Sequence, residues 1–118
     1  MPINIEQIRE HCLKKKSFTE EFPFDEETLV FKVCGKIFLL ASLESIPLQI
    51  NLKCDPEKAL ELREEYESVQ PGYHMNKKHW NTIIIDGSVS IRKIFEWIDE
   101  SYYLVASGLK KSELKKIK

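Results

Sequence analysis

Apolar residues recur at helical spacing in three parts of the chain. Near the start, Ile5 and Ile8 fall on one helical face, and Asn4 followed three residues later by Gln7 forms a capping box. Three lysines then suit the negative end of a helix dipole. This pattern predicts a helix over residues 5–16.

Two later segments show the same period. Asp55 before Pro56 is a typical helix start, with a cap followed by proline at the first helical position, and Ser90 is a suitable cap for the last helix. The predicted buried stripes are Ala59, Leu62 and Tyr66 in the first of these helices, and Ile91, Ile94, Ile98, Tyr102, Val105 and Leu109 in the second.

Between the helical segments the pattern favours strands. Thr28–Cys34 alternates and Ile37–Leu43 is almost wholly apolar, so the two predict a hairpin that turns at Cys34-Gly35-Lys36. A third strand follows, whose polar residues are expected to face water: Gln49, Asn51 and Lys53. A β-branched run predicts a strand over Asn81–Asp86, and Phe18–Phe24 fits an edge strand or a loop equally well.

The predicted order is α-β-β-β-α-β-α, with one extra strand wherever the pattern is ambiguous. Strands joined by short turns form an antiparallel meander, and three amphipathic helices suffice to cover one face of it. The fold class is therefore α+β, in a single domain over residues 1–118 whose basic tail, 110–118, is expected to fray.

Composition agrees with one folded core. The chain has 118 residues, 42% hydrophobic and 31% charged, which excludes disorder, and no apolar run approaches a membrane span. We expect no signal peptide, no membrane contact and a cytoplasmic monomer. The three cysteines, Cys12, Cys34 and Cys54, form no paired motif, so we expect reduced thiols and neither a metal nor a cofactor.

The net charge of −1 conceals blocks of one sign. Residues 20–27 hold five acids and no base, and residues 55–67 hold six acids. Residues 68–82 hold two lysines and no acid, and the tail from Ser101 holds five lysines. A nucleic-acid binder is usually basic as a whole, so any surface for a polyanion must be a local patch that the acidic blocks face away from.

Residues 71–82 carry the chemistry that stands out. They hold two histidines, two lysines, two asparagines, a tyrosine and a tryptophan, and no acid. Lysines neutralise phosphates, asparagine amides read adenine edges, and aromatic rings stack on unpaired bases. With the hairpin turn, the candidate nucleic-acid contacts are Lys36, Tyr73, His74, Asn76, Lys77, Lys78, His79, Trp80 and Asn81.

A structural interpretation of the same residues stays open. Trp80 is favoured as a core anchor and Asn81 as a partner of buried backbone groups, and His74 fits either role. His74 and His79 lie five residues apart but have no second pair of metal ligands, and no thiol pairs with them as a nucleophile. Without a phosphate loop or a GxGxxG motif, we expect no enzyme.

The segment Pro71–Thr82, which reads PGYHMNKKHWNT, resembles the signature of the MmcQ/YjbR family. Residues 31–38 resemble the family's hairpin, with Cys34 where glycine is common. Similar matches cover the strand-to-helix junction at 52–57 with 62–63, the turn at 86–89 and the helix at 101–105, so the resemblance spans roughly 3–109. Ser90 stands where the family often has proline.

The resemblance implies a compact α+β fold related to frataxin-like and secretion-chaperone-like proteins. It also implies a small cytoplasmic bacterial DNA-binding protein without catalytic activity, in which hairpin loops flank a recognition surface as a double wing. We expect such binding to be weak and salt-sensitive. The alternative is a protein-interaction or adaptor domain of the same fold. A shared face for Lys36, Lys77, Lys78 and the tail lysines favours DNA, and interspersed acids favour the adaptor.

Overall fold

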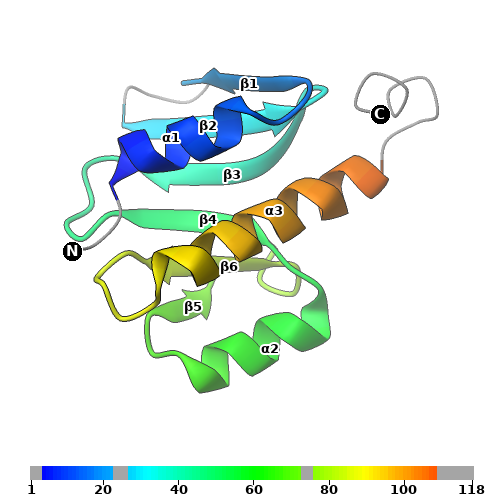
Figure 1. Ribbon diagram of the computed structural model, residues 1–118. Coiled ribbons are helices and arrows are strands. Elements are labelled where there is room, and N and C mark those ends of the chain that lie inside the picture. The colour runs from blue at the N-terminus through cyan, green and yellow to red at the C-terminus, as the bar shows by residue number, and fades with distance from the viewer. Residues whose placement is uncertain (1–3, 23–26, 73–75, 109–118) are drawn as a thin grey trace.

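The computed structural model describes residues 4–22, 27–72 and 76–108. Three helices and six strands follow one another in the order shown in Figure 1: α1 (Ile5–Leu13), β1 (Phe18–Glu21), β2 (Thr28–Val33), β3 (Lys36–Ser42), β4 (Gln49–Lys53), α2 (Pro56–Glu65), β5 (Val69–Pro71), β6 (Trp80–Ile84) and α3 (Ile91–Ser107). The predicted elements are all present, and the ambiguous segment after α1 is an edge strand. Within the described residues no helix is both long and apolar enough to cross a bilayer.

The predicted helix starts are confirmed. The Asn4 side chain accepts a hydrogen bond from Gln7 N, and the Gln7 side chain accepts one from Asn4 N, both at 2.9 Å. Asp55 and Ser90 cap α2 and α3 with one side-chain bond each, accepted from Glu57 N and Lys93 N. One boundary differs, because α1 ends at Leu13 rather than at residue 16, and the three lysines lie just beyond it.

The six strands form one antiparallel sheet in the order β1-β2-β3-β4-β6-β5. The β2–β3 hairpin closes through Cys34 and Gly35, whose φ angles are +47° and +79°. Positive φ at both central residues is the turn geometry that matches the twist of a tight hairpin. β5 was not predicted, because it is only three residues long and its alignment depends on pairing with β6.

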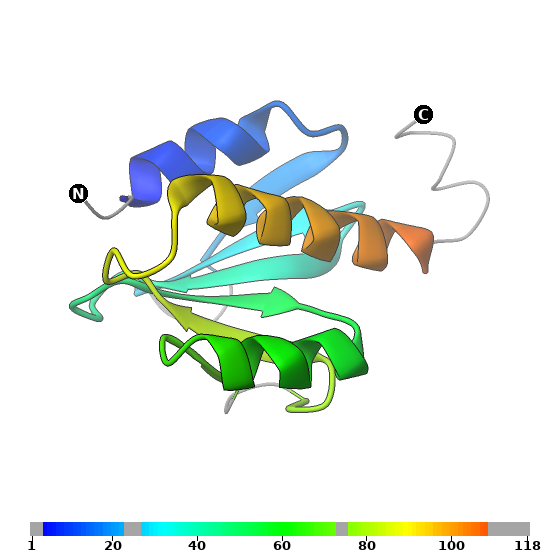
Figure 2. The same cartoon turned by 60° about the horizontal axis from the view of Figure 1, so that its bottom comes forward.

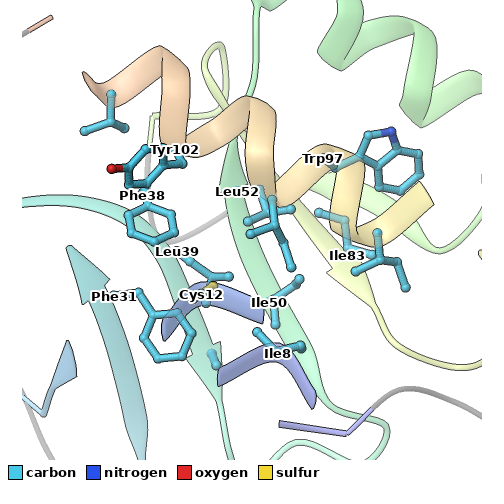
Figure 3. Close-up of a cluster of buried hydrophobic side chains, with 14 of the residues drawn as sticks. Ile8, Cys12, Phe31, Phe38, Leu39, Ile50, Leu52, Ile83, Trp97 and Tyr102 are labelled. Carbon is cyan, nitrogen blue, oxygen red and sulfur yellow. The ribbon is translucent and has the colours of Figure 1, made fainter. Parts of the chain in front are cut away.

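The main core lies between the sheet and the helices. Figure 2 shows α1 and α3 over one face of the sheet. Figure 3 shows side chains from both helices meeting those of the strands, with the Phe38 ring 5.3 Å from that of Tyr102. The third helix, α2, joins the same core at the β5 edge, where the Tyr66 ring lies 5.3 Å from Trp97. All three helices therefore contribute to one face, as predicted.

A second, smaller cluster lies on the opposite face. Val30 alternates with core residues of β2, and it packs with Leu40 and Trp80. Asn51 lies on this same face opposite Leu40 and is only 6% exposed, so the predicted wet position is wrong. Its side-chain oxygen accepts a hydrogen bond from Thr82 Oγ1 at 2.6 Å, which gives this buried oxygen a partner on the neighbouring strand.

Candidate nucleic-acid interface

The turn before β6 is closed by its own backbone. The Asn76 carbonyl accepts hydrogen bonds from the backbone N–H groups of His79, at 3.1 Å, and Trp80, at 3.0 Å. The Asn76 side-chain oxygen accepts a third, from Lys78 N at 2.9 Å. Asparagine supports such turns because its side chain can bond to nearby backbone. The result is a fixed turn that leaves Asn76, Lys77 and Lys78 exposed.

Arg63 of α2 holds this turn against the sheet. Its Nε donates to Asn81 Oδ1 at 2.7 Å, and one terminal nitrogen donates to the carbonyls of Trp80, at 3.2 Å, and Lys77. Sequence reasoning did not assign Arg63 this role. Two features of the sequence could have indicated it: Arg63 is the arginine of an acidic helix, and Asn81 was predicted to be a buried asparagine that needs a partner.

Asn81 and Trp80 serve the fold, as the structural interpretation predicted. Asn81 is 2% exposed, and its amide nitrogen donates to the Ala59 carbonyl at 3.4 Å. Trp80 is 8% exposed and lies against Gly72, where an added Cβ would come within 2.9 Å of Trp80 Cβ. Neither side chain presents a free face to a base.

Of the remaining predicted contacts, the structure describes His79 and Lys36. His79 is half-buried, and its carbonyl accepts a hydrogen bond from Cys54 N at 2.7 Å, which ties the turn to the end of β4. Lys36 is exposed at the start of β3. Tyr73 and His74 lie outside the described residues, so their predicted roles stay predictions.

One end of the sheet gathers the lysines. Lys36 begins β3, and the last residue of β4, Lys53, pairs with Trp80 just after the turn. The segment after α1 joins the same end, because the Ser17 carbonyl accepts a hydrogen bond from Cys34 N at 3.2 Å. We call this the lysine end, on the right in Figure 1; its lysines outside α2 are Lys14, Lys15, Lys16, Lys36, Lys53, Lys77 and Lys78.

The other end of the sheet, which we call the acidic end, carries most of the acids of the strands and connections. They are Glu21, Glu27, Glu44, Glu67 and Asp86, joined by Glu64 and Glu65 at the end of α2. Arg92 and Lys93 begin α3 at this end. At the lysine end, Asp55 and Glu57 begin α2, so some acid lies near the lysines. The tail lysines lie outside the described residues.

Two of the cysteines, Cys12 and Cys54, are buried. Burial raises the pKa of Cys12 to about 12 and also raises the pKa of Cys54, so both favour the neutral form. Within residues 4–22, 27–72 and 76–108, no group of three or more His, Cys, Asp or Glu side chains is placed to hold a metal.

The YjbR family model matches residues 13–104, which include the β2–β3 hairpin and the turn before β6. The chain belongs to the YjbR family. Among YjbR relatives, the uncharacterised protein YbdF of Escherichia coli O157:H7 is 44% identical over 98 residues, covering 82% of this chain and 80% of that protein. The uncharacterised protein YjbR of Escherichia coli is 31% identical over 101 residues, 85% of each chain.

Solved structures agree with this assignment. A crystal structure of a Deinococcus radiodurans protein with a DUF419 domain superposes on this YjbR-family chain with a TM-score of 0.91. The two are 40% identical, and the match covers 97% of this chain and 87% of that one. A Pseudomonas syringae protein gives a TM-score of 0.75 at 26% identity, over 87% of this chain and 99% of that one. The predicted family and α+β fold are confirmed.

Proposed function

We propose that this YjbR-family protein is a non-catalytic DNA-binding protein that contacts duplex phosphates with its lysine end. The observation that carries the proposal is the gathering of exposed Lys36, Lys77 and Lys78 on two turns at one end of the sheet, while most acids of the described strands and connections lie at the other. Such a separation gives a protein of near-zero net charge a local surface that attracts a polyanion.

The spacing of the two turns supports a two-pronged contact. The β2–β3 turn and the β5–β6 turn are separated along the sheet by three strand spacings, which amount to about 14 Å. This separation is comparable with the major-groove width of about 12 Å. The end of β4 lies between the turns, so they flank it as the wings that the family resemblance implies.

We expect this binding to depend little on sequence. Asn76 already uses its side-chain oxygen within the turn, and Asn81 is buried, so the two amides are poorly placed to read adenine together. Phosphate contacts remain, and each contributes about −0.9 to the slope of log K against log salt. The affinity is therefore expected to be weak and salt-sensitive.

The test is a fluorescence-anisotropy titration of a labelled duplex at several salt concentrations. The variant Lys77→Ala/Lys78→Ala is compared with Arg92→Ala/Lys93→Ala, which removes the same charge from the acidic end. We expect the first variant to flatten the salt slope by up to about 1.8 and the second to leave it unchanged. Absence of binding at low salt, or equal slopes in both variants, would overturn the proposal and favour the adaptor alternative.

A further inference from the structure

A hollow of about 280 Å³ opens beside the end of α1, against the second half of α3. It is lined by His11, Lys14, Lys15, Lys16, Tyr102 and Tyr103. Lys36, Lys77 and Lys78, which carry the duplex proposal, do not line it. We propose that this hollow binds a phosphate monoester attached to an aromatic base, either a free nucleoside monophosphate or the phosphorylated end of a strand.

The charge around the hollow suits a dianion. The Asp99 carboxylate beside the hollow lies 2.6 Å from Lys15 Nζ and 2.7 Å from His11 Nε2. Burial raises the pKa of Asp99, but the hydrogen bonds from Lys15 and His11 outweigh it and hold that pKa below its usual value. Lys15 balances the charge of Asp99, so the charges of the other two lining lysines, Lys14 and Lys16, remain. These two charges match the charge of about −1.5 to −2 on a phosphate monoester.

The aromatic side chains have different exposures. Tyr102 is 5% exposed and donates from its hydroxyl to the Lys16 carbonyl at 2.6 Å, which fixes the segment after α1. Tyr103 is 65% exposed, with its ring 5.5 Å from that of Tyr102. Lys15 Nζ lies 4.9 Å and 5.7 Å from the two ring centroids, so its ammonium is held in place before any ligand arrives.

These features together define the ligand class. An exposed tyrosine beside positive charge offers a stacking surface for a base, next to the group that neutralises its phosphate. The volume lies near the small end of the range for ligand pockets, which suits a single nucleotide. The three lysines also compensate the negative end of the α1 dipole, but that role requires neither the hollow nor the exposed Tyr103 ring.

The test is an NMR titration of the protein with adenosine monophosphate, inorganic phosphate and adenosine. We expect saturable shifts at the lining residues, with adenosine at least about tenfold weaker than adenosine monophosphate because two lysine contacts are lost. Lys14→Ala/Lys16→Ala, both at exposed positions, should weaken the nucleotide by a similar factor. Tyr103→Ala should weaken the nucleotide about fivefold or more and leave inorganic phosphate unchanged.

Two further arms separate the sources of the ligand and the two proposals. A terminally phosphorylated tetranucleotide is compared with its hydroxyl-ended counterpart, and preference for the phosphorylated form identifies strand ends as ligands. Lys77→Ala/Lys78→Ala should leave nucleotide binding intact, so failure of the duplex surface is distinguishable from failure of the hollow. No saturable binding of any phosphate monoester at millimolar concentration, or equal binding by the Lys14/Lys16 variant, would overturn the inference.

Discussion

The two ends of the sheet differ in charge although they are built from the same strands. At the lysine end the connections carry exposed lysines, and at the acidic end they carry Glu44, Glu67 and Asp86. Antiparallel pairing causes the separation, because successive connections fall alternately at the two ends. The net charge of −1 therefore conceals a separation of positive and negative side chains between the two ends of the sheet.

The two ends also differ in how they are held. At the lysine end, the charged Arg63 side chain reaches from α2 to the buried Asn81 amide and to backbone carbonyls. At the acidic end, Ser88 Oγ donates to Asp86 Oδ1 at 2.6 Å, where both residues are exposed, and it lies 3.0 Å from Oγ of the buried Ser68. Charge-assisted hydrogen bonds to buried groups are stronger than hydrogen bonds between exposed groups. We therefore expect mutations to lower the free energy of unfolding more at the lysine end.

The largest expected effect is at Trp80. Replacing this buried ring by alanine leaves a void beside Val30 and Leu40 and should destabilise the protein by about 3–5 kcal/mol. Urea denaturation followed by circular dichroism measures the loss. A Trp80→Ala protein as stable as wild type would show that the start of β6 does not anchor the lysine end.

Arg63→Ala comes next. It leaves the buried Asn81 oxygen without its donor, and we expect a loss of about 2–3 kcal/mol in the free energy of unfolding. The matched control is Arg92→Ala at the acidic end, where the side chain is 90% exposed and the expected change is below about 0.5 kcal/mol. Equal losses in the two variants would remove the difference between the ends.

Ser88→Ala should lower the free energy of unfolding by less than Arg63→Ala does, by about 0.5–1 kcal/mol at neutral pH, because one neutral hydrogen-bond donor is lost. The hydrogen bonds from Ser88 hold the pKa of Asp86 below its ordinary value. A lowered carboxyl pKa stabilises the fold above the unfolded-state pKa of about 3.9, and that contribution disappears as the pH falls through the folded value.

The stability gap between wild type and Ser88→Ala should therefore narrow below about pH 4. At the lysine end, Arg63 bonds to an amide oxygen and two backbone carbonyls, none of which titrates in that range. The stability difference between wild type and Arg63→Ala should consequently not narrow below about pH 4. Thermal melts of both variants across the acidic range make the comparison, and parallel curves would contradict it.

Sequence patterns predicted the features that depend on neighbouring residues. The caps at Asn4, Asp55 and Ser90 and the turn at Cys34-Gly35 each require only a few adjacent side chains, so the local signal was sufficient. Asn51 was misplaced because strand alternation shows which face a residue lies on, but not what covers that face.

The candidate site was only partly predictable for the same reason. The exposed lysines of the turn follow from composition, but Arg63 contacts partners 14 to 18 residues further along the chain. The hollow joins Lys16 to Tyr102, which are separated by 86 residues. No sequence period connects such positions, so only the packing of the helices on the sheet brings them together.

The most direct test of the charge comparison maps amide chemical shifts during titration of the protein with a short DNA duplex at low salt. The account predicts that perturbations concentrate at Lys36, Lys53, Lys77 and Lys78 and shrink as salt rises, while the amides of Glu44, Glu67 and Asp86 stay in place. Perturbations centred on the acidic end, or spread evenly over both ends, would contradict it.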